Sequence, residues 1–325
     1  MTVLAEIPAD PTDPAWHEAR RSFIGASDAP KILGQSPWGN ALDVWAEKHG
    51  LIPPSGPTLA TDLGHELEDL IARRWVAAAP GRGILNPRTT VRHPDMPHIA
   101  ASIDRRALNG ELLECKYVGP TTAAEWSNGP PLHVQVQVQV QMAVTGAPRA
   151  HVCALIIDRA AGWHTWPIDR DDQAIGMILG RLDRWWQDHI IRGTQPDLDG
   201  NPWDIRDTLT RIYPGADSTP VRLTGAAVDL IRDIKHSKQL AKEIDAQIVA
   251  AENELRAELG DATDGFDDDN QAPLVTWRPQ TRTSWATKDV LAGAVEGFTQ
   301  EELDIAARVL RAVERTTTTR VLRIK

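Results

Sequence analysis

Cysteine, long apolar runs and positive charge are all scarce in this sequence, and each shortage excludes a class of protein. Only two cysteines, Cys115 and Cys153, occur among 325 residues, too few for a disulfide framework, a four-cysteine zinc site or an iron–sulfur cluster. No run of about 18 uncharged apolar residues occurs, which excludes a transmembrane helix. The net charge is −10, whereas a general binder of polyanions is basic throughout.

The start of the chain indicates the cellular compartment, and the distribution of charge indicates where a phosphate site is expected. The first 14 residues hold three acidic side chains and no Lys or Arg, the reverse of a secretory signal peptide. Together with the two thiols, they predict a reducing, cytoplasmic setting. Residues 51–150 hold nine basic and nine acidic side chains. Because this stretch is neutral within an acidic chain, a site that handles phosphate is expected there.

Two regions of different character predict two domains, residues 1–215 and 216–325. Short β-rich runs alternate with helical segments in the first region. From Ala226 to Leu259 the chain has no Pro or Gly, and apolar side chains recur at three-, four- and seven-residue steps, as in a coiled-coil seam. Thr224 is the expected N-cap of this long helix and Gly260 its expected end.

Further segments carry the patterns of helices and strands. In the first region we expect helices at 28–33, 41–49, 63–78 and 171–191, and strands at 89–93, 98–108, 111–118, 150–157 and 162–168. In the second region we expect a strand at 274–277, helices at 288–292 and 299–313, and a strand at 316–324. In residues 134–144, Val and Gln alternate. An alternation of apolar and polar residues is the period of a strand, whereas the intrinsic preference of Gln is for a helix. The pattern alone leaves both structures open.

A candidate catalytic site lies on the hairpin 98–118, whose turn is an Asn-Gly pair. Asp104 and Glu114 offer carboxylates and the Cys115 carbonyl offers a third oxygen, the ligand type that hard divalent cations prefer. Lys116 lies two residues beyond Glu114, hence on the same face of the strand, where its cation can stabilise charge on a phosphate. These groups can hydrolyse a phosphodiester, although Glu-x-Lys on a strand is more often a solvated ion pair.

The length of the turn decides whether the two carboxylates can act together. A two-residue loop pairs Asp104 with Cys115 and turns Glu114 to the other face of the sheet. A three-residue loop, 108–110, instead pairs Asp104 with Glu114 and brings both to one face. The metal site therefore requires the three-residue loop, or another odd length, with Gly110 in the left-handed conformation.

Glu68 is a further carboxylate candidate, on the helix expected at 63–78. It follows Gly64 by four residues, so the two residues lie one turn apart on the same face of the helix. Because Gly64 has no side chain, the backbone there is exposed and a substrate could approach it. A solvated helix face is the alternative. The residues alone do not separate Glu68 from its neighbours Glu66 and Asp69.

Taken in order, these motifs resemble those of the phage λ exonuclease and YqaJ-type viral recombinase family, within the PD-(D/E)xK nuclease superfamily. The resemblance covers roughly residues 16–170. It rests on five motifs in the family's order: Trp16-His17-x-x-Arg20 with Ile24-Gly25-Ala26-Ser27, Gly64-His65-Glu66-Leu67-Glu68, Ser102-x-Asp104, Glu114-x-Lys116, and Gln137-Val138-Gln139 followed by Met142 and Val144-Thr145. The last motif resembles the family's glutamine helix, which decides residues 134–144 in favour of a helix.

The resemblance implies a fold and a role for each site residue. The expected fold is α/β, a restriction-endonuclease-like PD-(D/E)xK core whose mixed central sheet is flanked by helices, plus a C-terminal long-helix module with a small β element. The implied metal and catalytic groups are Asp104, Glu114, the Cys115 backbone carbonyl, Lys116 and Glu68. The implied 5′-phosphate ligands are Arg20, Ser27, Ser102 and Gln137, with Gln139 supporting them. Which of Gln135, Gln137, Gln139 and Gln141 match the family stays open, and Gln137 and Gln139 are preferred.

The implied activity is degradation of double-stranded DNA from its 5′ ends, leaving 3′ single strands for recombination, with Mg²⁺ as cofactor and Mn²⁺ as a substitute. The resemblance also implies a ring-shaped homotrimer, a single-strand annealing protein as partner, no membrane, and the host cytoplasm if a phage encodes the protein. An endonuclease on the same core is one alternative, which would cut closed circular DNA. A catalytically silent DNA-binding or interaction protein is another. Residues 216–325 lie outside the core and are expected to hold no catalytic residue.

Overall fold

A computed structural model describes residues 14–53, 58–79, 82–86, 90–158, 161–215, 219–266, 268 and 274–277. The chain divides into two compact units, Met1–Pro214 and Gly215–Lys325. Among the described helices, none is both long enough and apolar enough to cross a lipid bilayer.

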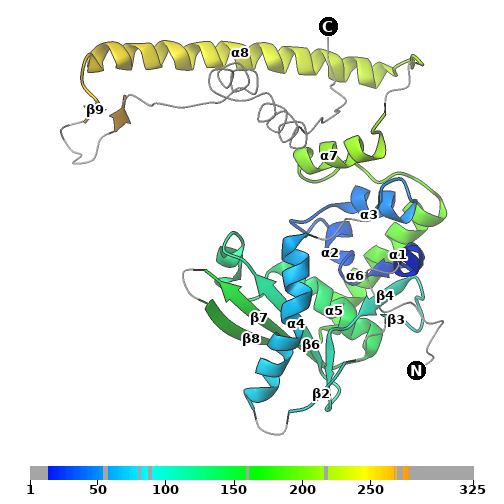
Figure 1. Cartoon of the computed structure of the whole chain (residues 1–325). Helices are drawn as coiled ribbons and strands as arrows, with labels where there is room; N and C mark the ends of the chain where they lie inside the picture. Colours follow the sequence, from blue (N-terminus) through cyan, green and yellow to red (C-terminus); the bar gives the residue numbers. More distant parts are fainter. Residues whose placement is uncertain are drawn as a thin grey trace, which may run out of the picture. The chain divides into compact units, whose positions relative to one another are not determined.

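The first unit is built around a mixed five-stranded sheet (Figure 1). Its strands, in spatial order, are β2 (Ile84–Leu85), β5 (Arg105–Ala107), β6 (Leu112–Val118), β7 (Arg149–Ile157) and β8 (Ala161–Asp169). The β6–β7 pair is parallel, and the other three pairs are antiparallel. The expected strands 111–118, 150–157 and 162–168 are confirmed to within one residue at each end.

A second, three-stranded sheet consists of β1 (Ile24–Gly25), β4 (Ile99–Ser102) and β3 (Thr90–Arg92). The expectation of one strand over 98–108 is wrong, because β4 and β5 belong to different sheets. The chain bends between them at Asp104, whose carboxylate accepts the N–H of Cys115 at 2.8 Å. A side chain thus takes a hydrogen bond that a backbone carbonyl would accept in a continuous ladder.

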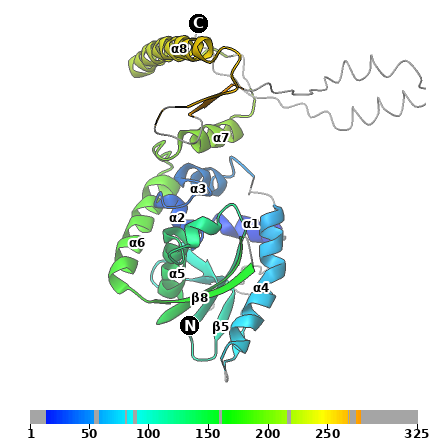
Figure 2. The same ribbon diagram turned by 90° about the vertical axis from the view of Figure 1, so that its left-hand side faces the viewer.

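Helices cover both faces of the five-stranded sheet (Figure 2). One face carries α4 (Leu59–Ala77), and the other carries α5 (Leu132–Thr145), which packs against α6 (Asp172–Trp185). The expected helix 63–78 begins four residues earlier, because Thr58 forms a capping box with Thr61. The long helix expected at 171–191 continues from α6 as a π-helical turn (Trp186–Ile191).

Residues 134–144 form the helix α5, as the family resemblance implied. The valines at alternate positions are buried all around α5, because the helix lies between the sheet and α6. A helix that is apolar on every side is a buried one. Gly146, at φ 71°, ends it in the left-handed conformation.

Smaller helices complete the first unit: α1 (Pro14–Arg20), α2 (Ala29–Ile32), α3 (Ala41–Lys48) and α7 (Pro202–Ile212). The helices α2 and α3 lie within the expected segments 28–33 and 41–49. The expected α/β class, with mixed sheets flanked by helices, is confirmed.

The second unit contains α8 (Gly225–Leu259) and a short antiparallel pair, β9 (Asp264–Gly265) with β10 (Val275–Thr276). Thr224 caps α8 by accepting the N–H of Ala227, and Gly260 follows its last turn. The expected long helix and small β element are thus confirmed. The apolar seam of α8 is exposed, at 61% for Leu230 and 55% for Ile244. The elements expected at 288–292, 299–313 and 316–324 lie outside the described residues.

Candidate functional site

The β5–β6 hairpin has the register that the metal site requires. Arg105 pairs with Leu113 in the antiparallel ladder, and continuing this register by one position places Asp104 opposite Glu114. The loop between the strands therefore has three residues. Its last residue, Gly110, has φ 90°, in the left-handed region that glycine adopts without strain. The odd-length turn that the metal site requires is therefore present.

Glu114 is a buried carboxylate with a partner for each oxygen. Only 2% of the residue is exposed. Gln137 donates to its Oε1 at 2.7 Å, and Gln141 donates to its Oε2 at 2.7 Å. The Lys116 ammonium lies 2.6 Å from Oε1. A buried charge must be paired and hydrogen-bonded, and α5 supplies two of these three partners from positions one helical turn apart.

Lys116 extends from the same face of β6 as Glu114, as the Glu-x-Lys spacing predicts. Its Nζ also donates to Gln137 Oε1 at 3.2 Å. Burial lowers the pKa of the Lys116 ammonium, but the negative charges of Glu114 and Asp104 outweigh it and raise the pKa above its ordinary value. The site therefore holds a cation beside its two carboxylates.

Asp104 lies in a crowded acidic environment. Burial raises the pKa of Asp104 well above its usual range, and the negative charges of Glu114 and Glu68 raise it further. A divalent cation relieves such repulsion, and carboxylate and carbonyl oxygens are the ligands that Mg²⁺ prefers. The donor set of Asp104, Glu114 and the Cys115 carbonyl thus fits a hard metal ion. Over the part of the chain that the structure describes, no three His, Cys, Asp or Glu side chains are grouped closely enough to hold a metal by themselves.

The structure separates Glu68 from Glu66 on α4 but not from Asp69, because Glu68 and Asp69 both pair with Arg105. Glu66 is exposed, whereas Glu68 is half-buried and forms an ion pair with Arg105. Arg105 is itself buried and also pairs with Asp69. Sequence reasoning missed Arg105, although a charged residue next to Asp104 on a buried strand was a signal that it has a partner.

The four residues expected to bind a 5′-phosphate line one cavity of about 120 Å³. Asp104 lines the same cavity, so the expected phosphate ligands and the candidate metal ligand face one space. The full lining is Trp16, Arg20, Phe23, Gly25, Ala26, Ser27, Ser102, Asp104 and Gln137. We call this space the phosphate cavity.

Within the phosphate cavity, Arg20 is held by a carboxylate that the sequence did not indicate. Its Nη2 lies 2.6 Å from Asp28 Oδ1, and its guanidinium lies over the Trp16 ring at 5.0 Å. Asp28 is buried, and Lys48 from α3 also pairs with it at 2.9 Å. Ser27 is exposed and does not cap α2, whose N-cap position is Asp28.

The glutamines of α5 divide between two faces. Gln137 and Gln141 reach Glu114, but Gln139 is turned away, accepting the N–H of Asp171 and donating to the Asp169 carbonyl. The preference for Gln139 as a supporting site residue is therefore wrong in its placement. Two residues along a helix correspond to a rotation of roughly 200°, so Gln139 holds the start of α6 instead.

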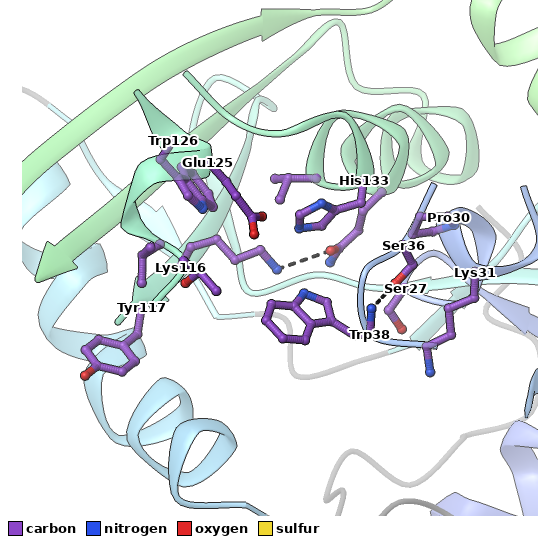
Figure 3. A pocket seen from close by; sticks show the side chains of 14 residues that line it. Ser27, Pro30, Lys31, Ser36, Trp38, Lys116, Tyr117, Glu125, Trp126 and His133 are labelled. Atoms are coloured by element: carbon purple, nitrogen blue, oxygen red, sulfur yellow. Dashed lines mark hydrogen bonds between the residues drawn. The ribbon is translucent and has the colours of Figure 1, made fainter. Parts of the chain in front are cut away.

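A second cavity of about 260 Å³ adjoins the first and shares Ser27 and Gln137 with it. Figure 3 shows the Lys116 ammonium and the rings of Trp38 and His133 directed into this space. Trp38 is 62% exposed. We call this space the aromatic cavity. Asp104 lines the phosphate cavity, Lys116 lines the aromatic cavity, and Gln137 lines both.

The chain is similar in sequence to a known domain family and to a bacterial protein. Residues 15–148 match the YqaJ-like viral recombinase domain. The chain is 30% identical over 278 residues to the uncharacterized protein YqaJ of Bacillus subtilis (strain 168), covering 84% of this chain and 85% of that protein.

Two solved exonuclease structures are similar at lower identity. The alkaline exonuclease LHK-Exo from Laribacter hongkongensis is 20% identical, with a TM-score of 0.48 over 55% of this chain and 94% of that one. A phage-related exonuclease from Haemophilus somnus 129PT is 12% identical, with a TM-score of 0.43 over 53% of this chain and 96% of that one. The extent of the match to the Bacillus protein, together with the matched domain, shows that this chain belongs to the YqaJ-like viral recombinase family.

Proposed function

We propose that the protein is a Mg²⁺-dependent exodeoxyribonuclease that degrades double-stranded DNA from its 5′ ends. The observation that carries this proposal is the shared lining of the phosphate cavity. Arg20 and Asp104 face one small space, so an end phosphate held by Arg20 lies beside the carboxylates that would hold the metal. An enzyme that binds an end phosphate next to its metal site cleaves close to that end.

The residues divide the chemistry among them. Asp104, Glu114 and the Cys115 carbonyl would hold the metal ion, Mg²⁺ or Mn²⁺, which lowers the pKa of bound water and polarises a phosphoryl oxygen. Lys116 stabilises negative charge on the phosphate that is attacked. Gln137 and Gln141 fix the direction of the Glu114 carboxylate.

The phosphate cavity supplies recognition of the end. The Arg20 guanidinium is a natural partner for a phosphate, because its planar donors match phosphate oxygens. The hydroxyls of Ser27 and Ser102 and the amide of Gln137 line the same cavity and can hydrogen-bond the remaining oxygens. Glu68 does not line this cavity, but its charge adds to the negative potential at Asp104.

The aromatic cavity suits an unpaired base. Trp38 is an exposed ring beside Lys116, and bases stack on aromatic side chains with little dependence on sequence. A terminal nucleotide that spans the two cavities has its phosphate at Arg20 and its base at Trp38. Removal of successive nucleotides leaves 3′ single strands for homologous recombination. A single-strand annealing protein as partner and a ring-shaped homotrimer belong to the same proposal, and membership of a viral recombinase family supports it.

One experiment tests the activity and separates it from its alternatives. Purified protein is incubated with linear duplex DNA carrying a 5′-phosphate, the same DNA with a 5′-hydroxyl, and closed circular DNA, each with and without Mg²⁺. We expect Mg²⁺-dependent release of mononucleotides, fastest from the phosphorylated ends. Cleavage of the closed circle would identify an endonuclease instead, and binding without cleavage would identify a silent DNA-binding protein.

A further inference from the structure

A buried carboxylate between two cations lies behind the phosphate cavity. Asp28 accepts from Arg20 at its Oδ1 (2.6 Å) and from Lys48 at its Oδ2 (2.9 Å). The side chains of Asp28 and Lys48 are 2% and 3% exposed, whereas that of Arg20 is 26% exposed. Only Arg20 of the three lines the phosphate cavity. Asp28 and Lys48 therefore make no direct contact with a ligand there, and act on it through Arg20 and through their charges.

Hydrogen bonds fix this group in one arrangement. The Gly25 N–H donates to Asp28 Oδ2 at 3.0 Å, and Lys48 Nζ donates to the Arg20 carbonyl at 2.8 Å. A Cβ at Gly25 would lie 3.3 Å from Asp28 Oδ2 and 3.4 Å from Arg20 Nη2, tighter than most real contacts. The absence of a side chain at Gly25 thus lets the carboxylate and guanidinium approach the backbone.

Charge counting shows why two cations are needed. A guanidinium paired with one carboxylate forms a neutral unit, which attracts a phosphate weakly. Lys48 adds a second positive charge, so the group of Arg20, Asp28 and Lys48 carries a net charge of about +1. Farther away, Lys31 and Glu47 also act on this group, with opposite signs that leave the sum unchanged.

The ionisation of Asp28 agrees with this count. Burial raises the pKa of Asp28, but the charges of Arg20 and Lys48 outweigh it and hold the pKa well below its usual range. Burial is the largest effect on Lys48 and holds its pKa below the ordinary value, although the ionised Asp28 beside it opposes this shift and favours the charged form. Lys48 donates both of its hydrogen bonds to oxygen acceptors, the Arg20 carbonyl and the Asp28 carboxylate.

We propose that Lys48 is a positioning residue for recognition of the 5′-phosphate: it neutralises Asp28, so that Asp28 can fix the Arg20 guanidinium without cancelling its charge. This inference rests on the proposed function, because it assumes that the ligand of Arg20 is a terminal phosphate. Lys48 itself does not touch the DNA.

The test measures binding, so that it does not depend on cleavage. Fluorescence anisotropy in EDTA gives the affinity of full-length protein for a duplex with a 5′-phosphate and for the same duplex with a 5′-hydroxyl. The ratio of the two affinities is the readout. The variants are Lys48→Met, Lys48→Gln, Asp28→Asn and the double variant Asp28→Asn/Lys48→Met. Arg21→Gln is the matched control, since Arg21 is the next residue but is exposed and paired with Glu18.

We expect Lys48→Met and Lys48→Gln to lower the phosphate preference by roughly tenfold, the effect of one charge-assisted contact. Lys48→Gln keeps a polar side chain with a hydrogen-bond donor. A lower phosphate preference in this variant is therefore caused by the missing charge and not by altered packing. Asp28→Asn should retain the preference, and the double variant should recover most of it, because Arg20 alone restores the net charge. Arg21→Gln should keep the wild-type ratio.

Other outcomes would overturn the proposal in distinguishable ways. A wild-type ratio in folded Lys48→Gln shows that Lys48 has a purely structural role. A double variant as impaired as Lys48→Met shows that the charge balance with Asp28 is irrelevant. If the wild-type protein itself binds both ends equally, recognition of the end phosphate fails, and this inference fails with it. Thermal unfolding of each variant confirms that it is folded before its ratio is used.

Discussion

Gln141 donates its side-chain amide to Glu114 Oε2 at 2.7 Å, so that a buried residue of α5 directs a candidate metal ligand on β6. The same amide lies 3.3 Å from the Ser102 carbonyl, at the end of β4. Gln141 therefore joins the two sheets of the first unit at the candidate active site. It is a residue whose function the sequence left open.

Replacing Gln141 by Leu should lower the cleavage rate by roughly tenfold to a hundredfold, the usual cost of losing an outer-shell partner of a metal ligand. The Mg²⁺ concentration for half-maximal activity should rise as well. Steady-state rates over a Mg²⁺ titration give both quantities. Gln139→Leu is the matched control on the opposite face of α5. It should lower the melting temperature and leave the Mg²⁺ dependence unchanged.

Asp104→Ala, Glu114→Ala and Lys116→Ala should each reduce cleavage by at least about a hundredfold, while DNA binding persists, because these groups act on the transition state. Removing the metal with EDTA should stop the wild-type enzyme, and Mg²⁺ or Mn²⁺ should restore it. Glu66→Ala, on the exposed side of α4, should remain active. Wild-type rates in any of the first three variants would contradict the site.

Trp38→Ala should raise KM for duplex ends by roughly tenfold, because base stacking on an aromatic ring contributes about 1–3 kcal/mol. Trp38→Phe should retain most of the affinity. The control is Trp203→Ala, which removes an equally exposed tryptophan, 65% exposed, from α7. Equal effects of the two alanine variants would show that the aromatic cavity binds no base.

The stability of the first unit should depend on pH through Asp28. Its pKa is lower in the folded state than in the unfolded chain, so the unfolded chain takes up the proton first. The stabilisation is complete above the unfolded pKa of about 4 and is lost as the pH falls through the folded value. Melting temperatures from pH 6 to pH 2.5 should therefore fall less steeply in Asp28→Asn than in the wild type. Parallel curves would contradict this assignment.

Truncation after Gly215 should leave a folded protein with metal-dependent cleavage. The described apolar core residues and every candidate site residue lie in the first unit. We expect the loss of residues 216–325 to change assembly or processivity, because the apolar seam of α8 is exposed and suited to a partner surface. Light scattering gives the oligomeric state, and product lengths give the processivity. A folded truncated protein without activity would place a catalytic contribution in the second unit.

Local rules predicted the parts of the site that local geometry determines. Strand periodicity put Glu114 and Lys116 on one face, whereas turn parity gave only the condition, a loop of odd length, under which Asp104 lies opposite Glu114. Both follow from a period of two residues. The interruption between β4 and β5 could not be predicted in this way, because it depends on where the Asp104 side chain finds a donor.

Hydrogen-bond partners that lie far apart in the chain could not be predicted from the sequence, for a different physical reason. Lys48 lies 20 residues from Asp28, and no periodicity relates a side chain on α3 to one before α2. The preference for Gln139 failed because the Val–Gln alternation has a period of two, whereas a helix turns by 100° per residue. Neighbouring glutamines of the series therefore point to different sides.

The three-residue loop of the β5–β6 hairpin bears on how this protein can vary. Surface loops ordinarily accept insertions and deletions, and this one is exposed at Leu108. Here one added or deleted residue would shift the pairing and turn Glu114 away from Asp104. Natural variation at this tip should therefore consist of substitutions or of changes by two residues at a time, and a library built on this scaffold would keep that length fixed.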